Sequence, residues 1–439
     1  MLSMAPMRLP HNIGRYAPFG WVALSILVLS CQKAPWLTMA QRGTLPELSH
    51  AIAQGQQHNA FTRARVEELA VAVAQREIRS ATDPEGEHIL AQLSDCALRL
   101  EAPLLLRAER TDETAGTALQ ALVAAGWQFP NEDWASAIAS ARGALRAAAA
   151  LDSQAKERWA IRQTLLNDAD PRVRLAALKS CLKAPALQHW DTLVALLRRD
   201  PEPQCRQDAA ISIGILGGDE ATSVLMDAWA RADAPLRMAI VSALSQARTF
   251  SIGGQRRLIA IARSEPGLVG VLAAANLATG TSVARSFGSA RLTRSLEFGA
   301  SEDKALAISV ADWRLPEHAE QLLRLGLTAE PEIRVHALGR WLAQPDHQFP
   351  AITWLRQLAL GDSSAALLAR ELLALQGDQT VRLALRAQLG HAKWASRAHA
   401  ARLLWKLGDV SGVAQALADD APEVRVATAC GVLLPGNSP

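Results

Sequence analysis

Reactive side chains are sparse in this sequence, and none of them forms a recognised catalytic pattern. The chain has no HExxH zinc motif, no GxSxG elbow, no phosphate-binding glycine loop and no CxxC pair. His391 and His399 lie eight residues apart, so they can share one helix face, but no third ligand stands near them. Adjacent acids such as Glu67 and Glu68 point in different directions on a helix and cannot share a substrate. We therefore expect no catalytic residue, no metal, no cofactor and no small-molecule substrate.

Arginine is the one chemically active side chain that gathers in a single stretch. Between residues 248 and 296 there are seven arginines and one acid, Glu265, which gives this stretch a net charge of +6. Guanidinium groups bind carboxylates and phosphates through paired hydrogen bonds, so the stretch predicts a surface for an acidic peptide, anionic lipid headgroups or an anionic polymer. The alternative is a solvated face balanced by acids of neighbouring segments. The candidate partner-binding residues are Arg256, Arg257, Arg263, Arg291 and Arg294.

The first thirty residues have the pattern of an export signal. Residues 1–16 carry two arginines and no acid, and an apolar run follows over residues 17–30. This run is too short to span a membrane, which takes about 20 residues. The run ends Val28-Leu29-Ser30-Cys31, which resembles the lipobox of bacterial lipoproteins. The resemblance implies cleavage before Cys31 and lipidation of its sulfur and amino group, which would anchor the mature chain to a membrane.

The residue after the lipobox bears on the destination of the chain. Gln32 follows the cysteine, and the absence of aspartate there resembles the pattern of lipoproteins sent to the outer membrane. We therefore expect the cell envelope, on the periplasmic face of the outer membrane. The alternative is an ordinary signal or a short anchor in which Cys31 has no role.

Four further cysteines lie among apolar residues within helical patterns, and we expect them to be buried free thiols. Disulfides in any of three connectivities are the alternative for an exported protein. These cysteines are Cys96, Cys181, Cys205 and Cys430.

One phrase recurs along the chain at intervals of about 31 residues. Its clearest copy begins at Asp168 and reads Asp-Ala-Asp-Pro-Arg-Val-Arg-Leu-Ala-Ala-Leu. Aspartate before proline can cap a helix, the aliphatic residue points inward, and alanine lets neighbouring helices approach. Weaker copies fill the gaps near Gly270, Ala305 and Ala366. The arginine near the middle of the phrase is Arg174, and it recurs as Arg206, Arg237, Arg334, Arg397 and Arg425.

The phrase resembles the HEAT repeat in its short bacterial form, over residues 155–439 at least. The resemblance implies an all-α fold, a right-handed α-solenoid of stacked antiparallel helix pairs. The phrase helix is the first of each pair, and its arginine can pair with acids of adjacent repeats. The second helix usually lines the concave face, and the arginine stretch falls on second helices. Second helices are expected at Leu187–Arg198, Ala221–Arg231, Arg256–Arg263, Glu317–Leu327, Ile352–Leu360 and Thr380–Leu389. Helix breaks are expected at Gly214, Gly217, Gly218, Gly377 and Gly408.

The chain divides into four parts: a signal peptide (1–30), a tether with one helix near 45–57 (31–60), diverged helical repeats (61–150) and the solenoid (151–439). A separate helical domain is the alternative for the third part, in which Arg142 marks a degenerate repeat. The chain stops soon after its last phrase, so we expect the last helix to pack against a partner or a second copy. The helices expected in the third part are Arg63–Ser80, Glu85–Arg99, Thr114–Ala125 and Trp134–Ala150.

Twelve of the aromatic residues are tryptophan, and four of these fall on apolar helix positions. We expect Trp36, near the tether, to be exposed. An exposed subset could stack on sugars or peptides, and the alternative is a structural role in the core. The core candidates are Trp190, Trp229, Trp354 and Trp405.

Composition and charge narrow the class of function. The chain has 439 residues, 49% of them hydrophobic and 20% charged, which is typical of a folded protein rather than a disordered one. Its net charge of +3 argues against nucleic-acid binding driven by overall charge. We expect a non-enzymatic, lipid-anchored HEAT-repeat scaffold of the bacterial cell envelope that binds a protein partner. An accessory lyase-type or nucleic-acid-binding HEAT protein is the alternative if the N-terminus is not a lipoprotein signal.

Overall fold

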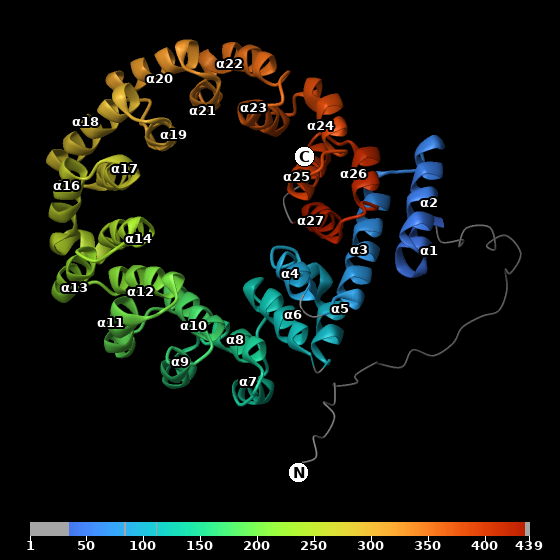
Figure 1. The fold of residues 1–439 in the computed structure, drawn as a ribbon, viewed down its shortest axis with the longest axis horizontal. Coiled ribbons are helices and arrows are strands. Elements are labelled where there is room, and N and C mark those ends of the chain that lie inside the picture. The colour runs from blue at the N-terminus through green and yellow to red at the C-terminus, as the bar shows by residue number, and fades with distance from the viewer. Residues whose placement is uncertain (1–34, 83–84, 111, 435–439) are drawn as a thin grey trace, which may run out of the picture.

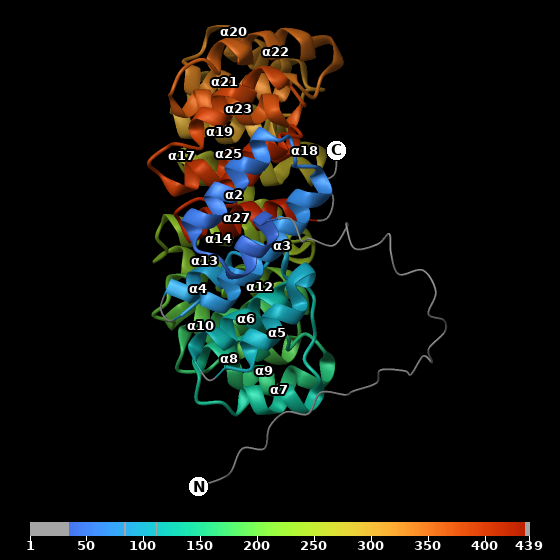
Figure 2. The same ribbon diagram turned by 90° about the vertical axis from the view of Figure 1, so that its right-hand side faces the viewer.

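The protein is a closed ring of helices. The computed structural model describes residues 35–82, 85–110 and 112–434, and every regular element in these ranges is a helix. The helices form an inner and an outer row that curve until the two ends of the chain meet (Figure 1). From the side, the rows form a band in which the N-terminal and C-terminal helices lie together on one flank (Figure 2). The expected all-α solenoid is confirmed.

The two rows alternate along the chain, so that each outer helix is followed by an inner one (Figure 1). The inner row consists of α4 (Glu85–Ala91), α6 (Glu113–Ala124), α8 (Gly143–Leu151), α10 (Pro171–Lys183), α12 (Pro203–Leu216), α14 (Ala234–Leu244), α17 (Gly267–Asn276), α19 (Ser301–Val310), α21 (Pro331–Trp341), α23 (Ser364–Leu375), α25 (Trp394–Lys406) and α27 (Pro422–Leu433). The outer row consists of α3 (Arg63–Ser80), α5 (Glu101–Ala108), α7 (Asn131–Ile138), α9 (Trp159–Leu165), α11 (Trp190–Arg199), α13 (Asp219–Trp229), α16 (Gln255–Ser264), α18 (Ser282–Phe298), α20 (Pro316–Thr328), α22 (Pro345–Leu358), α24 (Arg382–Gln388) and α26 (Val410–Ala416). Outside these rows lie α1 (Pro35–Arg42) and α2 (Leu45–Gln57), and short turns join the helices: η1 (Ala97–Leu100), η2 (Lys156–Arg158), η3 (Leu187–His189), α15 (Ala247–Thr249), η4 (Phe250–Gly254), η5 (Leu277–Thr279) and η6 (Gln379–Val381).

The inner row carries the repeated phrase. From α10 to α27, successive inner helices begin 28–34 residues apart, and the three weaker copies of the phrase are α17, α19 and α23. Asp170 starts α10 because its carboxylate accepts a hydrogen bond from the backbone N–H of Arg172 at 2.9 Å. Pro171 follows in the first turn, where a missing N–H costs nothing. A side-chain cap also starts α14, at Asp233, and α23, at Ser363.

The inner row is the shorter path around the ring, so its helices must approach each other closely. Gly214 of α12 lies against α14, where a Cβ on this glycine would overlap the carbonyl oxygen of Ala243. Gly116 of α6 and Ala144 of α8 make the same close contact. The Ala- and Gly-rich phrase helices therefore lie inside, and the second helix of each pair lies on the convex side. The expectations that second helices line the concave face and that Gly214 breaks a helix are both wrong.

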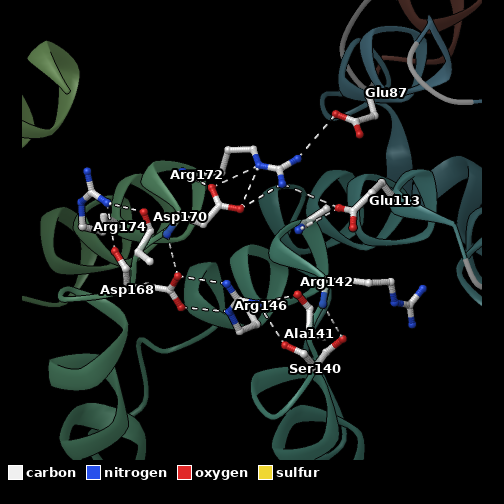
Figure 3. A network of polar contacts seen from close by, with 12 residues as sticks. Glu87, Glu113, Ser140, Ala141, Arg142, Arg146, Asp168, Asp170, Arg172 and Arg174 are labelled. Atoms are coloured by element: carbon white, nitrogen blue, oxygen red, sulfur yellow. Dashed lines mark hydrogen bonds and ion pairs between the residues drawn. The ribbon is translucent and has the colours of Figure 1, made fainter. Parts of the chain in front are cut away.

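Ion pairs between successive repeats reinforce the inner row. Arg174 binds Asp200 through two hydrogen bonds of 2.8 and 2.9 Å and also donates to the carbonyl oxygens of Asp168 and Ala169. One repeat earlier, Arg146 binds the Asp168 carboxylate at 2.9 and 3.0 Å (Figure 3). The expected pairing of phrase arginines with acids of adjacent repeats is confirmed at Arg174, Arg237 and Arg397, whereas Arg206 and Arg334 form no ion pair within the described residues. We call this set the arginine ladder; its pairs are Arg146–Asp168, Arg174–Asp200, Arg397–Asp419 and Arg425–Glu77.

The degenerate repeat before α10 is marked by Arg146 rather than by Arg142. Arg142 precedes α8 and donates to the carbonyl oxygens of Arg110 and Asp112 at 3.2 Å. A second network crosses the inner face here, because Arg172 lies 3.7 Å from Glu113 and 3.8 Å from Glu87 (Figure 3). These longer pairs are exposed and add little stability.

The ring closes because α27 packs against α3. Arg425, the last ladder arginine of the described chain, binds the buried Glu77 of α3 through two 2.9 Å hydrogen bonds. A disulfide joins Cys96 to Cys430, which are 334 residues apart in the sequence. One hydrophobic core runs through this seam, from the N-terminal helices to the last ones. The last helix therefore packs against the start of its own chain, and the expected partner or second copy at Val432, Leu433 and Leu434 is not needed.

The disulfide corrects part of the expectation for the cysteines. Cys181 and Cys205 are buried free thiols, as expected, whereas Cys96 and Cys430 are paired. Their Cα atoms lie 5.3 Å apart, within the range that a disulfide requires. The sequence could not show this pairing because the two residues lie at opposite ends of the solenoid.

The N-terminal part differs from expectation in four places. Residues expected to form a tether include α1, which packs against α3, and α2, which spans the expected 45–57. Trp36 is buried rather than exposed, with its ring 5.0 Å from that of Phe61. The helix expected over Trp134–Ala150 is divided into α7 and α8, and the one expected over Glu85–Arg99 ends at Ala91.

The four tryptophans expected in the core all contact it. Trp405 is buried, at 1% exposed, and Arg63 lies over its ring at 4.2 Å. The other three are partly buried and pack against the core: Trp190, Trp229 and Trp354.

Candidate functional site

The arginine stretch lies on the outer side of the ring. Arg256, Arg257 and Arg263 belong to α16, and Arg291 and Arg294 belong to the adjacent α18; both helices are in the outer row (Figure 1). The buried residues of α16 face the core, and its arginines occupy the remaining positions. These residues are thus displayed outward on a rigid helical surface.

Contacts within the stretch distinguish structural arginines from free ones. Arg291 is half-buried and donates from Nη2 to the backbone carbonyl of Glu265 at 3.3 Å. The guanidinium of Arg263 lies 4.0 Å from the centre of the Phe287 ring, so a cation–π contact joins α16 to α18. Arg256, Arg257 and Arg294 are exposed. Arg291 therefore has a structural role, whereas the exposed arginines remain available for binding.

The positive charge of this surface is not neutralised. Glu265, the one acid of the stretch, binds Arg237 of α14 at 3.2 Å. In the part of the chain that the structure describes, Arg256, Arg257 and Arg294 form no ion pair. Balance by acids of neighbouring segments, the alternative explanation, therefore does not occur through direct ion pairs. We call Arg256, Arg257, Arg263 and Arg294 the outer arginine surface.

The two free thiols and His189 are held in unreactive states by burial. Burial raises the pKa of the Cys181 thiol to about 11 and that of Cys205 to about 12, so both thiols stay protonated. Burial and the nearby Arg162 cation lower the pKa of His189 to about 4, so its imidazole is neutral at pH 7. Arg162 donates its Nε–H to His189 Nε2 at 3.0 Å, and His189 Nδ1 lies 2.7 Å from Gln163 Oε1. Both ring nitrogens are thus engaged in holding the fold.

His391 and His399 do not form a metal site in the structure. His399 lies 3.5 Å from Glu371 and 3.1 Å from an Arg402 nitrogen, while His391 Nδ1 accepts from the Lys393 backbone N–H at 3.0 Å. Among the described residues, no group of three or more histidines, cysteines and acids is placed to hold a metal ion.

The membrane anchor expected at Cys31 lies outside the described residues. Within the described ranges, no helix is both long enough and apolar enough to cross a bilayer.

The sequence analysis did not predict the seam between α3 and α27, because a contact between residues 77 and 425 leaves no local signal in the sequence.

Comparison with known proteins agrees with the repeat seen in the structure. Residues 159–245, from α9 to α14, match the family model described as HEAT repeats. This part of the chain is HEAT-like. The crystal structure of an engineered protein matches at 18% identity over 77% of this chain and 98% of that chain, with a TM-score of 0.27, a superposition too loose to carry an argument. No curated protein matches this chain.

Proposed function

We propose that this HEAT-like ring is a non-enzymatic, lipid-anchored scaffold of the bacterial cell envelope, which holds an acidic segment of a protein partner at the membrane. The observation that carries the proposal is the outer arginine surface, whose exposed guanidinium groups form no ion pair with an acid of the described chain. Such a surface attracts carboxylates and raises the rate of encounter with an acidic partner. A lipid on Cys31 would raise the local concentration of the ring near membrane-bound partners.

The disulfide supports a location outside the cytoplasm. Structural disulfides persist in oxidising compartments such as the periplasm and are rare in the cytosol of mesophiles. The Cys96–Cys430 bond lies at the ring seam, where it joins the two ends of the chain. It is therefore consistent with export through the N-terminal signal and with maturation at Cys31.

Metabolic labelling with a clickable palmitate analogue tests the anchor. We expect the wild type to incorporate the label and to lack residues 1–30 by intact mass, and Cys31→Ala to lose the label. An unlabelled, uncleaved product from the wild type would refute the lipoprotein part of the proposal. It would also bring back the nucleic-acid-binding and lyase alternatives.

Binding of a fluorescent oligoglutamate peptide tests the surface. The triple variant Arg256→Glu/Arg257→Glu/Arg294→Glu should weaken binding at least tenfold without lowering Tm, because these side chains are exposed. Arg291 is left intact since it holds the Glu265 carbonyl.

The matched control reverses three exposed arginines elsewhere, on α1, η1 and α20, and has the same net charge as the test variant. Equal weakening by both variants would show that overall charge, and not the outer arginine surface, governs binding. The control residues are Arg42, Arg99 and Arg324.

A further inference from the structure

A second basic site lies in the repeats formed by α11 to α14, which adjoin α16 of the outer arginine surface (Figure 1). A cavity of about 620 Å³ opens where α11 and α13 end and α12 and α14 begin. Four arginines from three segments line it: Arg198 and Arg199 at the end of α11, Arg206 in α12, and Arg231 just after α13. We call it the arginine pocket. Its volume is within the range of small-ligand sites.

The arginine pocket lies where the arginine ladder first stops, after the Arg174–Asp200 pair; Arg334 further along also forms no ion pair within the described residues. In three ladder pairs the accepting aspartate stands six residues before the next phrase arginine: Asp168, Asp200 and Asp419. In the repeat of Arg237, the residue six positions before the phrase arginine is Arg231 and not an aspartate. Arg206 is the phrase arginine of the preceding repeat, which the ladder spacing would pair with position 231, and both Arg206 and Arg231 line the cavity. A cation thus stands at the position where three other repeats have an aspartate.

Arg206 nevertheless makes the backbone hydrogen bonds that are typical of a ladder arginine. Its Nη1 donates to the carbonyl oxygens of Asp200 at 2.8 Å and Pro201 at 3.3 Å, as Arg174 does to the carbonyls of its own repeat. Its guanidinium is therefore held in place without an anionic partner. Only an anion from outside the chain could complete the arrangement.

The remaining charges of the pocket leave it strongly positive. Asp227 is its one acidic lining residue, and it lies 3.8 Å from Arg198, with both side chains at least half exposed. Arg199 and Arg231 form no ion pair within the described chain. Four arginines and one aspartate give a net charge of +3. Such crowding of cations is unfavourable unless an anion is bound.

We propose that the arginine pocket binds a phosphate-bearing anion in place of the missing ladder carboxylate. Guanidinium forks bind phosphate oxygens through paired hydrogen bonds, and a doubly charged phosphate balances more of the net charge than a single carboxylate does. The cavity has room for a substituent on the phosphate, and buried Leu197 and Leu236 with Met226 provide an apolar wall for it. The ligand is either a soluble phosphate ester or the headgroup of an anionic phospholipid.

Titration calorimetry of the full chain with inorganic pyrophosphate tests the proposal. The decisive variant is Arg231→Asp, which restores the aspartate that the other ladder repeats carry. It should pair with Arg206, leave Tm unchanged or higher, and weaken pyrophosphate binding at least tenfold. The matched control is Arg324→Asp, which makes the same charge change at an exposed site in α20 and should bind within about twofold of the wild type.

Two further arms distinguish the sources of the phosphate. Glycerol phosphate probes a soluble ester, and vesicles of phosphatidylglycerol in phosphatidylcholine probe a headgroup, using the Cys31→Ala chain so that no lipid anchor interferes. If the protein is retained on anionic vesicles and Arg231→Asp abolishes this retention, the ligand is a lipid headgroup. If the protein binds the soluble probes but is not retained on the vesicles, the ligand is a soluble phosphate ester.

Three results would overturn the proposal. The first is an absence of pyrophosphate binding by the wild type at millimolar concentration. The second is equal affinity for pyrophosphate in Arg231→Asp and Arg324→Asp. The third is binding of citrate as tight as that of pyrophosphate, which would show that the pocket does not select phosphate.

Discussion

The disulfide at the ring seam predicts a large, specific response to reduction. In an open solenoid each repeat contacts only its neighbours, so the terminal repeats lose their order first. Here α27 and α3 are neighbours, and Cys96–Cys430 links α27 to the start of η1, which packs beside α3. Replacing both cysteines by alanine removes the covalent link and leaves the Arg425–Glu77 pair in place.

The loop that this bond closes sets the expected size of the effect. Chain-entropy arithmetic for a loop of 334 residues gives about 5–6 kcal/mol, and native disulfides contribute about 2–5 kcal/mol in practice. We therefore expect a loss of about 3–5 kcal/mol in the free energy of unfolding. At about 2.1 cal/mol/K per residue over about 400 residues, this loss lowers Tm by about 4–6 °C.

Thermal unfolding with and without dithiothreitol measures this effect. The reductant should lower the Tm of the wild type to that of Cys96→Ala/Cys430→Ala, and should not change the Tm of this variant. Hydrogen exchange should rise most in α27 and α3. The matched control, Cys181→Ala/Cys205→Ala, removes the two free thiols and should keep the full response to reductant.

One result would refute the reasoning. If mass spectrometry shows the seam disulfide to be reduced while Tm falls by less than about 1 °C, the covalent link adds nothing to a ring that packing already closes.

Three further predictions follow from the inner row. Gly214→Ala should cost about 1–3 kcal/mol, because its Cβ would overlap the Ala243 carbonyl oxygen; an unchanged denaturant midpoint would contradict the close packing. Asp200→Ala leaves the Arg174 cation buried without its partner and should cost about 3–5 kcal/mol, measured by chemical denaturation; a cost below about 1 kcal/mol would mean that the ladder is not structural. The unfolded chain protonates His189 near pH 6.5 but the folded chain only near pH 4, so stability should fall by about 1.4 kcal/mol per unit as the pH drops from 6.5 towards 4, and His189→Gln should flatten this part of the pH profile.

The sequence by itself determined the repeat. Capping aspartates and first-turn prolines such as Asp170 and Pro171 act within a few residues, so the starts of the inner helices could be predicted from local pattern. The pairing of phrase arginines with acids of neighbouring repeats was also predictable, because constant spacing brings the same positions together at each step. For the candidate site, the cluster of arginines was visible as an excess of charge.

Which face of the ring displays those arginines was decided by packing. The sequence pattern does not say which helix of a pair lies inside, and the expectation for the second helix was wrong. Gly214 and Gly116 show the reason: the inner path is shorter, so the helix with the smaller residues must take it. The arginine pocket could not be predicted from the sequence for a related reason. Arg231 can be recognised as a charge reversal only after the structure shows which aspartates pair with phrase arginines in other repeats.

Closure of the ring was decided by tertiary structure alone. Each repeat fixes only a small rotation relative to the one before it, and these rotations add up over the whole chain before the ends meet. A small change in the rotation between successive repeats would separate α27 from α3 altogether. No local sequence motif indicates the total rotation. Glu77 and Cys96 look like ordinary helix residues in the sequence, and they become the partners of Arg425 and Cys430 only because the accumulated curvature brings the last repeat back to the first.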